Sequence, residues 1–250
     1  MSQLNDIPFS TLHFYLTASY ACSYLPNLPA RSQVATPAHL ITPGIYSELV
    51  QQGFRRSGSY TYRPRCDTCQ ACQSLRILAA DFLPSRTQRR AWQQHNSLQT
   101  SLHTLADKPE YYVLYQRYQA ARHKNGGMDN DDHEAYEKFL LRSDIESFIV
   151  EFREPSEHNA AGILRMVSVI DLLADGLSAV YTFFEPDLAH SSFGVYNVLW
   201  QIDLCRQLEL DFVYLGYWIK DSVKMTYKTQ YQPAQVLQNG TWQPYLKDTA

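Results

Sequence analysis

Length, composition and charge set broad limits on this chain. Its 250 residues suit one large domain or two small ones with a real core, and 45% hydrophobic and 19% charged residues exclude a disordered protein. The net charge of −3 predicts no nucleic-acid partner from global charge, and every apolar run falls short of the about 20 residues that span a membrane.

The N-terminus and the cysteines bear on the compartment. Met1–Ser10 places no basic residue before an apolar run, unlike a signal peptide, so we expect a cytoplasmic protein. Thiols stay reduced in the cytoplasm. The five cysteines therefore predict metal binding or chemistry rather than disulfides.

Residues 1–104 form the first predicted domain, a loop-rich region that contains cysteines and arginines. Proline and glycine recur there and interrupt regular elements. The expected elements are a helix at 43–52 capped by Thr42, strands at 59–62 and 74–78, and a polar helical segment at 86–103.

Residues 105–250 form the second predicted domain and read as strands followed by helices that alternate with strands. We expect helices at 110–124 and 131–141, a strand at 148–152, a hairpin of strands 162–170 and 177–184, an amphipathic helix at 193–208, a strand at 212–218 and a basic helix at 220–228. This order predicts an α+β fold with a mixed sheet.

Three cysteines are spaced as metal ligands are. Cys66, Cys69 and Cys72 lie three residues apart, a spacing that lets thiolates wrap one ion from a turn. A ferredoxin-like run would continue with a fourth cysteine where Arg76 stands, so Cys22 is the candidate for the fourth ligand. The alternative is that these are reduced structural thiols without a metal.

The same stretch is strongly basic. Between Arg55 and Arg90 there are eight arginines against Asp67 and Asp81, a local balance of 8 − 2 = +6 in a chain of net charge −3. Arginine forks bind phosphates and carboxylates in a bidentate manner. The run therefore predicts an anion-binding face, and the alternative is a solvated charged surface.

Two segments of the second domain could bind anions or nucleic acid. The turn that holds Ser192 and Gly194 precedes the amphipathic helix, and free N–H groups there suit a phosphate or an oxyanion, although Ser192 also reads as a simple N-cap. Lys220, Lys224 and Lys228 are four residues apart and share a helix face. Aromatic residues beside them suit unpaired bases, and the alternative is a solvated lysine face.

Several motifs together resemble one family. The run Tyr60-x-Tyr62-Arg63-Pro64-x-Cys66-x-x-Cys69-x-x-Cys72-x-x-x-Arg76 is similar to the N-terminal signature of the aminoacyl-tRNA–protein transferases, and Cys22-Ser-Tyr-Leu25 also fits. The run 171–187, Tyr214-Leu-Gly-Tyr-Trp-Ile219 and Lys224-Met225-x-Tyr227-Lys228 resemble the C-terminal signature. The resemblance covers residues 10–245 and points to the bacterial aspartate/glutamate leucyltransferase branch, which is related to eukaryotic arginyltransferases.

This resemblance implies a cytoplasmic enzyme of the N-end rule. It would transfer leucine from leucyl-tRNA to the α-amine of proteins that begin with Asp or Glu, which marks them for degradation. The second domain would have a GNAT-like acyltransferase fold. Transfer would require no cofactor, while Cys22, Cys66, Cys69 and Cys72 would offer a site for an iron–sulfur cluster, as in the eukaryotic relatives, or for zinc. The competing functions are arginine transfer from arginyl-tRNA, a GNAT-type acetyltransferase, and a non-catalytic zinc-dependent RNA-binding module.

The reaction assigns roles to individual residues, as hypotheses. Candidates for binding the acidic N-terminus are Arg56, Arg63, Arg76 and Arg165. Candidates for proton transfer are Asp171, Tyr181 and Glu185. Candidates for the tRNA are Lys220, Lys224, Tyr227 and Lys228, and Ser192 and Gly194 are candidates for the oxyanion or a phosphate.

Overall fold

An eight-stranded mixed sheet forms the centre of the computed structural model, which describes residues 11–122 and 132–246. The strand order is β14-β13-β7-β12-β11-β10-β9-β8, and β11–β12 is the parallel pair in it. The strands are β7 (Gln73–Leu78), β8 (Gln99–Thr104), β9 (Ser147–Ser156), β10 (Asn159–Leu172), β11 (Gly176–Phe184), β12 (Phe212–Trp218), β13 (Ala234–Gln238) and β14 (Thr241–Pro244). The mixed sheet predicted from the order of elements is confirmed.

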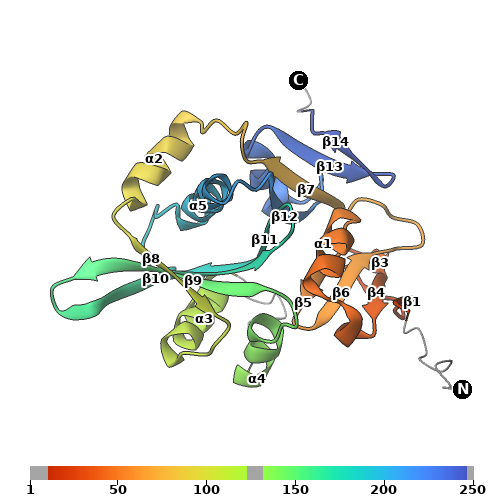
Figure 1. Ribbon diagram of the computed structural model, residues 1–250, viewed down its shortest axis with the longest axis horizontal. Helices are drawn as coiled ribbons and strands as arrows, with labels where there is room; N and C mark the ends of the chain where they lie inside the picture. The colour runs from red at the N-terminus through yellow and green to blue at the C-terminus, as the bar shows by residue number, and fades with distance from the viewer. Residues whose placement is uncertain (1–10, 123–131, 247–250) are drawn as a thin grey trace, which may run out of the picture.

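A smaller antiparallel sheet lies beside the large one (Figure 1). Its strands, in spatial order, are β1 (His13–Leu16), β4 (Ser32–Thr36), β6 (Tyr60–Pro64) and β5 (Arg55–Ser57). Short pieces accompany it: β2 (Tyr20–Ala21), β3 (Pro29–Ala30), η1 (Ala38–Leu40) and α1 (Pro43–Gln51). Thr42 caps α1 by accepting a hydrogen bond from the Ile45 amide at 3.4 Å, which confirms the predicted helix and cap.

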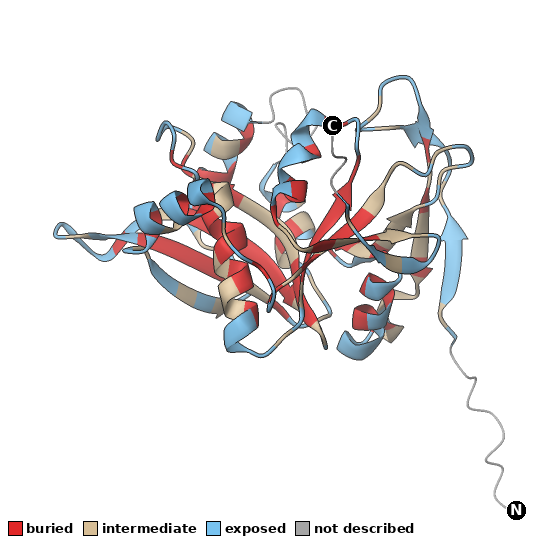
Figure 2. Ribbon diagram, turned by 90° about the horizontal axis from the view of Figure 1, so that it is seen from above, coloured by how far each residue is buried: buried red, intermediate tan, exposed pale blue. Residues whose placement is uncertain are grey.

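Helices cover both faces of the large sheet (Figure 1). On one face lie α5 (Phe193–Gln207), which packs its apolar side on the strands, and α2 (Arg86–His95), which packs on α5. On the other lie α3 (Pro109–Arg122), α4 (His133–Tyr136) and the π-helical turn η2 (Glu137–Leu141). Buried residues therefore concentrate along the strands between the two layers (Figure 2). Cys205 of α5 belongs to this core, as predicted.

Three sequence expectations differ from the structure. The polar segment 86–103 is helical only to His95, because β8 follows and pairs with β9 at the edge of the sheet. The basic segment near 220–228 is the 3₁₀ helix η3 (Val223–Gln230). The region predicted to be loop-rich contains the small sheet. The predicted end of the helix at 124 and start of the next at 131 lie outside the described residues.

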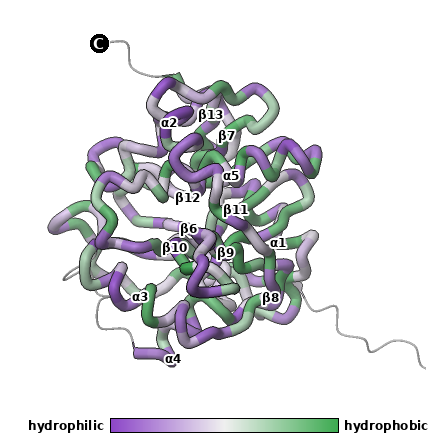
Figure 3. Tube along the Cα trace, turned by 90° about the vertical axis from the view of Figure 1, so that its left-hand side faces the viewer, coloured by the Kyte–Doolittle hydropathy of each residue, from purple (hydrophilic) through white to green (hydrophobic). Residues whose placement is uncertain are grey.

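The predicted boundary at 104/105 does not separate two sheets. Strands β7 and β8 come from the first predicted domain, yet β7 lies inside the large sheet between β12 and β13. The N-terminal residues therefore complete the core of the C-terminal ones. In the part of the chain that the structure describes, no helix is long and apolar enough to cross a membrane, and apolar and polar stretches alternate along the trace (Figure 3).

Candidate active site

The parallel strands β11 and β12 pair over a short stretch and then part. Their register runs from Gly176 opposite Phe212 to Ser178 opposite Tyr214 and ends there. Beyond this point β11 contains a bulge at Val180, where its register with β10 shifts. Bulges and unpaired strand edges expose main-chain groups that a ligand can use, so the gap between these strands is a candidate substrate site.

Arg55 of β5 reaches into this gap from the small sheet. Its guanidinium donates hydrogen bonds to the carbonyl oxygens of Ala179 and Val180 on β11, the latter at 3.4 Å, and to Leu215 on β12 at 3.3 Å. Gly216 makes room for it: its φ is +75°, and a Cβ there would lie 1.3 Å from Arg55 Nη1. The backbone at Gly216 is therefore built around the arginine.

Lys228 lies beside Arg55 rather than on the surface. Its Nζ donates to the carbonyl oxygens of Leu215 at 2.9 Å and Tyr217 at 2.6 Å, and the residue is 8% exposed. Burial and then the positive charge of Arg55 lower the pKa of Lys228 to about 7. In the 3₁₀ helix, residues four apart do not share a face, so Lys224 is exposed while Lys228 is buried.

Asp171 and Arg56 are brought together in the interior. The Asp171 carboxylate accepts from Arg56 Nε at 2.9 and 3.0 Å, Arg56 Nη2 at 2.7 Å, the Ser147 hydroxyl at 2.7 Å and the Tyr46 hydroxyl at 3.1 Å. The two side chains are 2% and 0% exposed for Arg56 and Asp171. Neither is open to a substrate in this structure, which fits a structural ion pair better than proton transfer or peptide binding.

Glu185 and Arg165 belong to a second charged cluster, at the other end of β11. Glu185 is buried and accepts from Arg117 Nη1 at 3.1 Å, while Arg165 Nη1 lies 3.9 Å from it. Arg165 Nε also donates to Glu154 at 2.6 Å. The two predicted site residues are thus in contact with each other and with further charged partners.

Arg76 and Arg63 are each held mainly by neutral groups, and Arg76 Nη1 also lies 4.0 Å from Asp175 Oδ2. Arg76 lies 3.6 Å over the Phe212 ring and 4.3 Å over the Trp242 ring, and donates to Gln235 and Tyr214. Arg63 donates to the Gln33 side chain at 2.8 Å and the Gln52 carbonyl at 2.9 Å.

The remaining proton-transfer candidate, Tyr181, follows the bulge on β11, and its hydroxyl accepts from Gln119 Nε2 at 2.9 Å.

The four predicted cysteine ligands line one large pocket. Cys22, Cys66, Cys69 and Cys72 face a cavity of about 1080 Å³ next to the small sheet, and none of them is in a disulfide. Burial, followed by the charges of the other three thiols, raises the pKa of Cys72 to about 12. The four residues therefore line the same pocket, and their role as metal ligands stays a prediction. Their sulfur atoms do not form a group of three within 4.8 Å.

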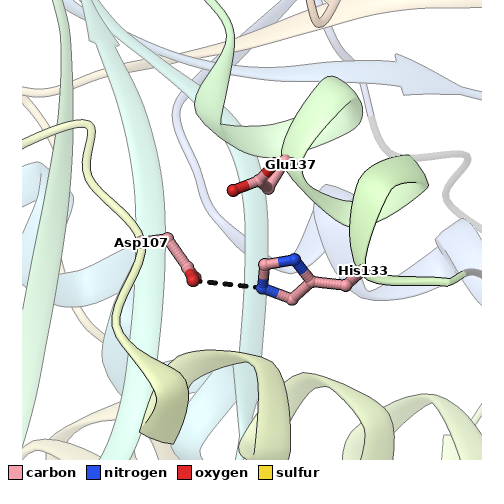
Figure 4. Close-up of side chains that lie close together, drawn as sticks. All are labelled: Asp107, His133 and Glu137. Atoms are coloured by element: carbon pink, nitrogen blue, oxygen red, sulfur yellow. Dashed lines mark hydrogen bonds and ion pairs between the residues drawn. The ribbon is translucent and has the colours of Figure 1, made fainter.

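Among the described residues, another group has a spacing that suits a metal ion. Asp107, His133 and Glu137 bring ligand atoms within 4.8 Å of one another, and His133 Nε2 lies 3.0 Å from Asp107 (Figure 4). Two of the three residues are exposed. Exposed acidic groups of this kind are common without a metal, so we do not assign a centre here.

The turn before α5 is strained. Ser192 and His190 have φ values of +52° and +55°, and Ser192 occupies the N-cap position without a side-chain capping bond. His95 bonds the Ser191 carbonyl oxygen and stacks on Phe193, which holds the turn against α2. The backbone amides in the first turn of α5 therefore receive no capping hydrogen bond from the Ser192 side chain.

Comparison with known proteins decides the family. The family model "Arginine-tRNA-protein transferase, N terminus" matches residues 20–90, and "Arginine-tRNA-protein transferase, C terminus" matches residues 110–238. The chain belongs to the arginine-tRNA-protein transferase family. This transferase is 56% identical to a relative from Nitrosospira multiformis (97% of this chain, 94% of the relative) and 53% identical to one from Polynucleobacter necessarius (98% of each), both named aspartate/glutamate leucyltransferase.

Solved structures resemble the transferase only weakly. L-PGS from Bacillus licheniformis has a TM-score of 0.48 and 8% identity over 70% of this chain and 59% of that one. FemX has a TM-score of 0.44 and 10% identity over 72% and 61%.

Sequence reasoning missed Arg55 although it counted the residue in the basic run. Adjacent residues on a strand point to opposite faces, so Arg55 and Arg56 of the transferase go to different places. Arg56 meets Asp171 in the core and Arg55 enters the gap. The glycine in Tyr214-Leu-Gly-Tyr was the one local signal for a close approach at this point.

Proposed function

We propose that this transferase moves leucine from leucyl-tRNA to the α-amine of proteins that begin with Asp or Glu, and so marks them for degradation. The proposal rests on the relatives, which are 50–56% identical to this chain and are named aspartate/glutamate leucyltransferase. The gap between the parallel strands β11 and β12, which Arg55 bridges, offers a place for the reaction. A parallel pair that parts next to a bulge also supports the GNAT-like acyltransferase fold that the resemblance implied.

The chemistry needs little activation. An aminoacyl ester is already activated, and the attacking α-amine has an ordinary pKa of about 7.7–8.0, so it is partly deprotonated near neutral pH. Positioning the amine against the ester then supplies much of the rate. Of the three proposed proton-transfer residues we retain Tyr181, because Asp171 and Glu185 are bound in ion pairs.

The tRNA is proposed to contact the exposed part of η3 and the turn before α5. Lys220, Lys224 and Tyr227 are exposed there, and their charge and aromatic ring suit a phosphate backbone and unpaired bases. Amides next to Ser192 and Gly194 offer a further phosphate or oxyanion site at the positive end of α5. Lys228 is buried and has another role, argued below.

The cysteine pocket is proposed to hold a metal centre. Four thiols on the wall of one cavity supply the ligand number of a zinc site or an iron–sulfur cluster. The cavity is large enough for either, and Arg31, Arg63 and Arg65 on its wall would offset the charge of thiolates. Such a centre would stabilise the loops of the small sheet, and the transfer step does not use it.

Aminoacyl transfer to matched peptides tests the function. The purified protein is mixed with radiolabelled leucyl-tRNA or arginyl-tRNA and with peptides that begin with Asp, Glu or Ala. We expect leucine on the Asp and Glu peptides alone. Arginine on the same peptides would keep the family and change the donor. Binding of tRNA without transfer would favour an RNA-binding module, and binding of CoA instead of tRNA would favour an acetyltransferase.

A further inference from the structure

We propose that Arg55 and Lys228 together bind the side-chain carboxylate of the acidic first residue of the acceptor protein. The inference rests on the proposed function, and it names the residues that select Asp and Glu. Neither residue was assigned this role from the sequence.

The two cations share an acceptor and have no acidic partner. The Leu215 carbonyl oxygen accepts from Arg55 Nη1 at 3.3 Å and from Lys228 Nζ at 2.9 Å. Every other hydrogen bond of the two side chains also ends on a main-chain carbonyl oxygen, and across 11–122 and 132–246 no carboxylate lies within ion-pair distance of either. Lys228 is buried and Arg55 is half-buried, and two like charges held together in such a place are unfavourable until an anion joins them.

Most other arginines near the candidate site already have an acidic partner. Arg56 is bound by Asp171, and Arg165 by Glu154. Arg76 is stacked between aromatic rings and lies 4.0 Å from Asp175. Two further arginines of the large sheet and its helices are also ion-paired: Arg117 with Glu185, and Arg153 with Glu110. Arg55 and Lys228 stand out as cations at the gap that still lack a carboxylate.

The position suits the first residue of an acceptor. Arg55 crosses the gap at Ala179 and Val180, where β11 leaves the ladder. The carboxylate of Asp or Glu is only a few bonds from the attacking α-amine, so a carboxylate held here places the amine at the gap. An arginine fork with a neighbouring ammonium is the usual means of binding such a group.

Aromatic hydroxyl groups surround the pair. Arg55 is close enough to Tyr62 and Tyr227 for its charge to offset part of the rise that burial causes in the pKa of each. Tyr227 is 46% exposed. Tyr217 also touches the pair, because its carbonyl oxygen accepts from Lys228, and its hydroxyl donates to the Gly53 carbonyl at 3.0 Å.

Steady-state transfer to paired peptides tests the inference. The measured quantity is kcat/KM with leucyl-tRNA for a peptide that begins with Glu, divided by the value for the same peptide beginning with Gln. Arg55→Gln and Lys228→Gln are each expected to lower this ratio by about 10- to 150-fold, the effect of one hydrogen bond to a charged group. The KM for leucyl-tRNA is expected to stay within about twofold, since the pair faces the peptide.

One variant controls for structural effects, and the second test variant covers a failure of the first to fold. Arg206 also donates only to main-chain carbonyl oxygens, those of Ala79, Ala80 and Phe82, so Arg206→Gln removes the same kind of contact far along α5. It is expected to leave the ratio unchanged. Lys228→Gln keeps a donor for both carbonyl oxygens, and it decides the question if Arg55→Gln does not fold.

The outcomes separate this inference from the proposed function. An equal fall for the Glu and Gln peptides would overturn it, because a purely structural residue or an oxyanion donor acts on both. A change of the ratio in Arg63→Gln, with none in Arg55→Gln and Lys228→Gln, would also overturn it and move the site to the cysteine pocket. If the unmodified protein transfers nothing to the Glu peptide, the proposed function itself fails.

Discussion

Arg56 and Asp171 form an ion pair that is closed to solvent and joins the small sheet to the large one. Arg56 lies on β5 and Asp171 on β10, and the shortest distance between a guanidinium nitrogen and a carboxylate oxygen is 2.7 Å. Ser147 and Tyr46 donate to the same carboxylate. The pair thus fixes β5, and with it Arg55, against the large sheet.

Removing the charge of Asp171 is expected to affect stability rather than chemistry. Asp171→Asn leaves Arg56 buried without an ionic partner, which costs about 3–5 kcal/mol of unfolding free energy. Urea denaturation measures the loss, and the folded fraction should retain its kcat. Asp144→Asn, at an exposed carboxylate, should change stability by no more than about 0.5 kcal/mol. A stable but inactive Asp171→Asn would return this residue to catalysis.

Local patterns predicted the elements well where one face was apolar. The hairpin of β10 and β11, the helix α5 and the strand β12 lie within a few residues of their expected bounds. Each has a hydrophobic period that suits one structure, and the Thr42 cap was a local signal too. The 3₁₀ helix η3 was not predictable in this way. Lys228 is buried there because its Nζ donates to the Leu215 and Tyr217 carbonyl oxygens of β12, which lie outside the local segment.

The candidate site was harder to predict because its contacts are long-range. Sequence spacing brought the cysteines to one region, and the structure places all four on one pocket. Asp171 lies 115 residues from Arg56, and the carbonyl partners of Arg55 on β11 lie at least 124 residues from it, so no local pattern specifies these contacts. Composition alone therefore could not tell an arginine that is already paired from one that is open to substrate.

Acid is expected to weaken a charged cluster around Glu151. Hydrogen bonds from Arg153, Lys108 and Tyr111 hold the pKa of Glu151 at about 2, below its ordinary 4.5, although burial opposes the shift. A depressed pKa favours the folded state above pH 4.5, and this contribution is lost as the pH falls from 4.5 to 2. His103, 3.6 Å away, also faces the carboxylate.

The matching variant is Glu151→Gln. At pH 7 it should lower the unfolding free energy by about 1.5–3 kcal/mol, because charge-assisted hydrogen bonds are lost. The difference from the unmodified protein should shrink steadily below pH 4.5. Urea melts at several pH values measure it, and a difference that stays constant down to pH 2 would contradict the assignment.

Substitution of a cysteine in the pocket is expected to reduce the amount of bound metal. Cys72→Ser should reduce the zinc or iron bound per purified chain, because this residue lies among the other three thiols. Elemental analysis measures the metal, and visible absorption separates an iron–sulfur cluster from zinc. Cys205→Ser is the control: this thiol lies on the buried face of α5, so the change should lower stability and leave the metal content intact. Equal metal content in both variants would exclude a centre at Cys72.

Alanine substitutions at two glycines can separate the effect of a steric clash from the effect of backbone conformation. Gly216 and Gly240 have φ values of +75° and +78°, so alanine at either costs about 1–2 kcal/mol for the left-handed backbone. A Cβ at Gly240 meets nothing within 4 Å, whereas one at Gly216 meets the Arg55 guanidinium. Gly216→Ala should therefore displace Arg55 from the gap and lower transfer to an Asp or Glu peptide by at least about 10-fold. Gly240→Ala should lose stability alone, as thermal melts and transfer assays on both variants would show. Equal activity in the two variants would mean that transfer does not require Arg55 between β11 and β12. The gap would then no longer be a candidate for the reaction site.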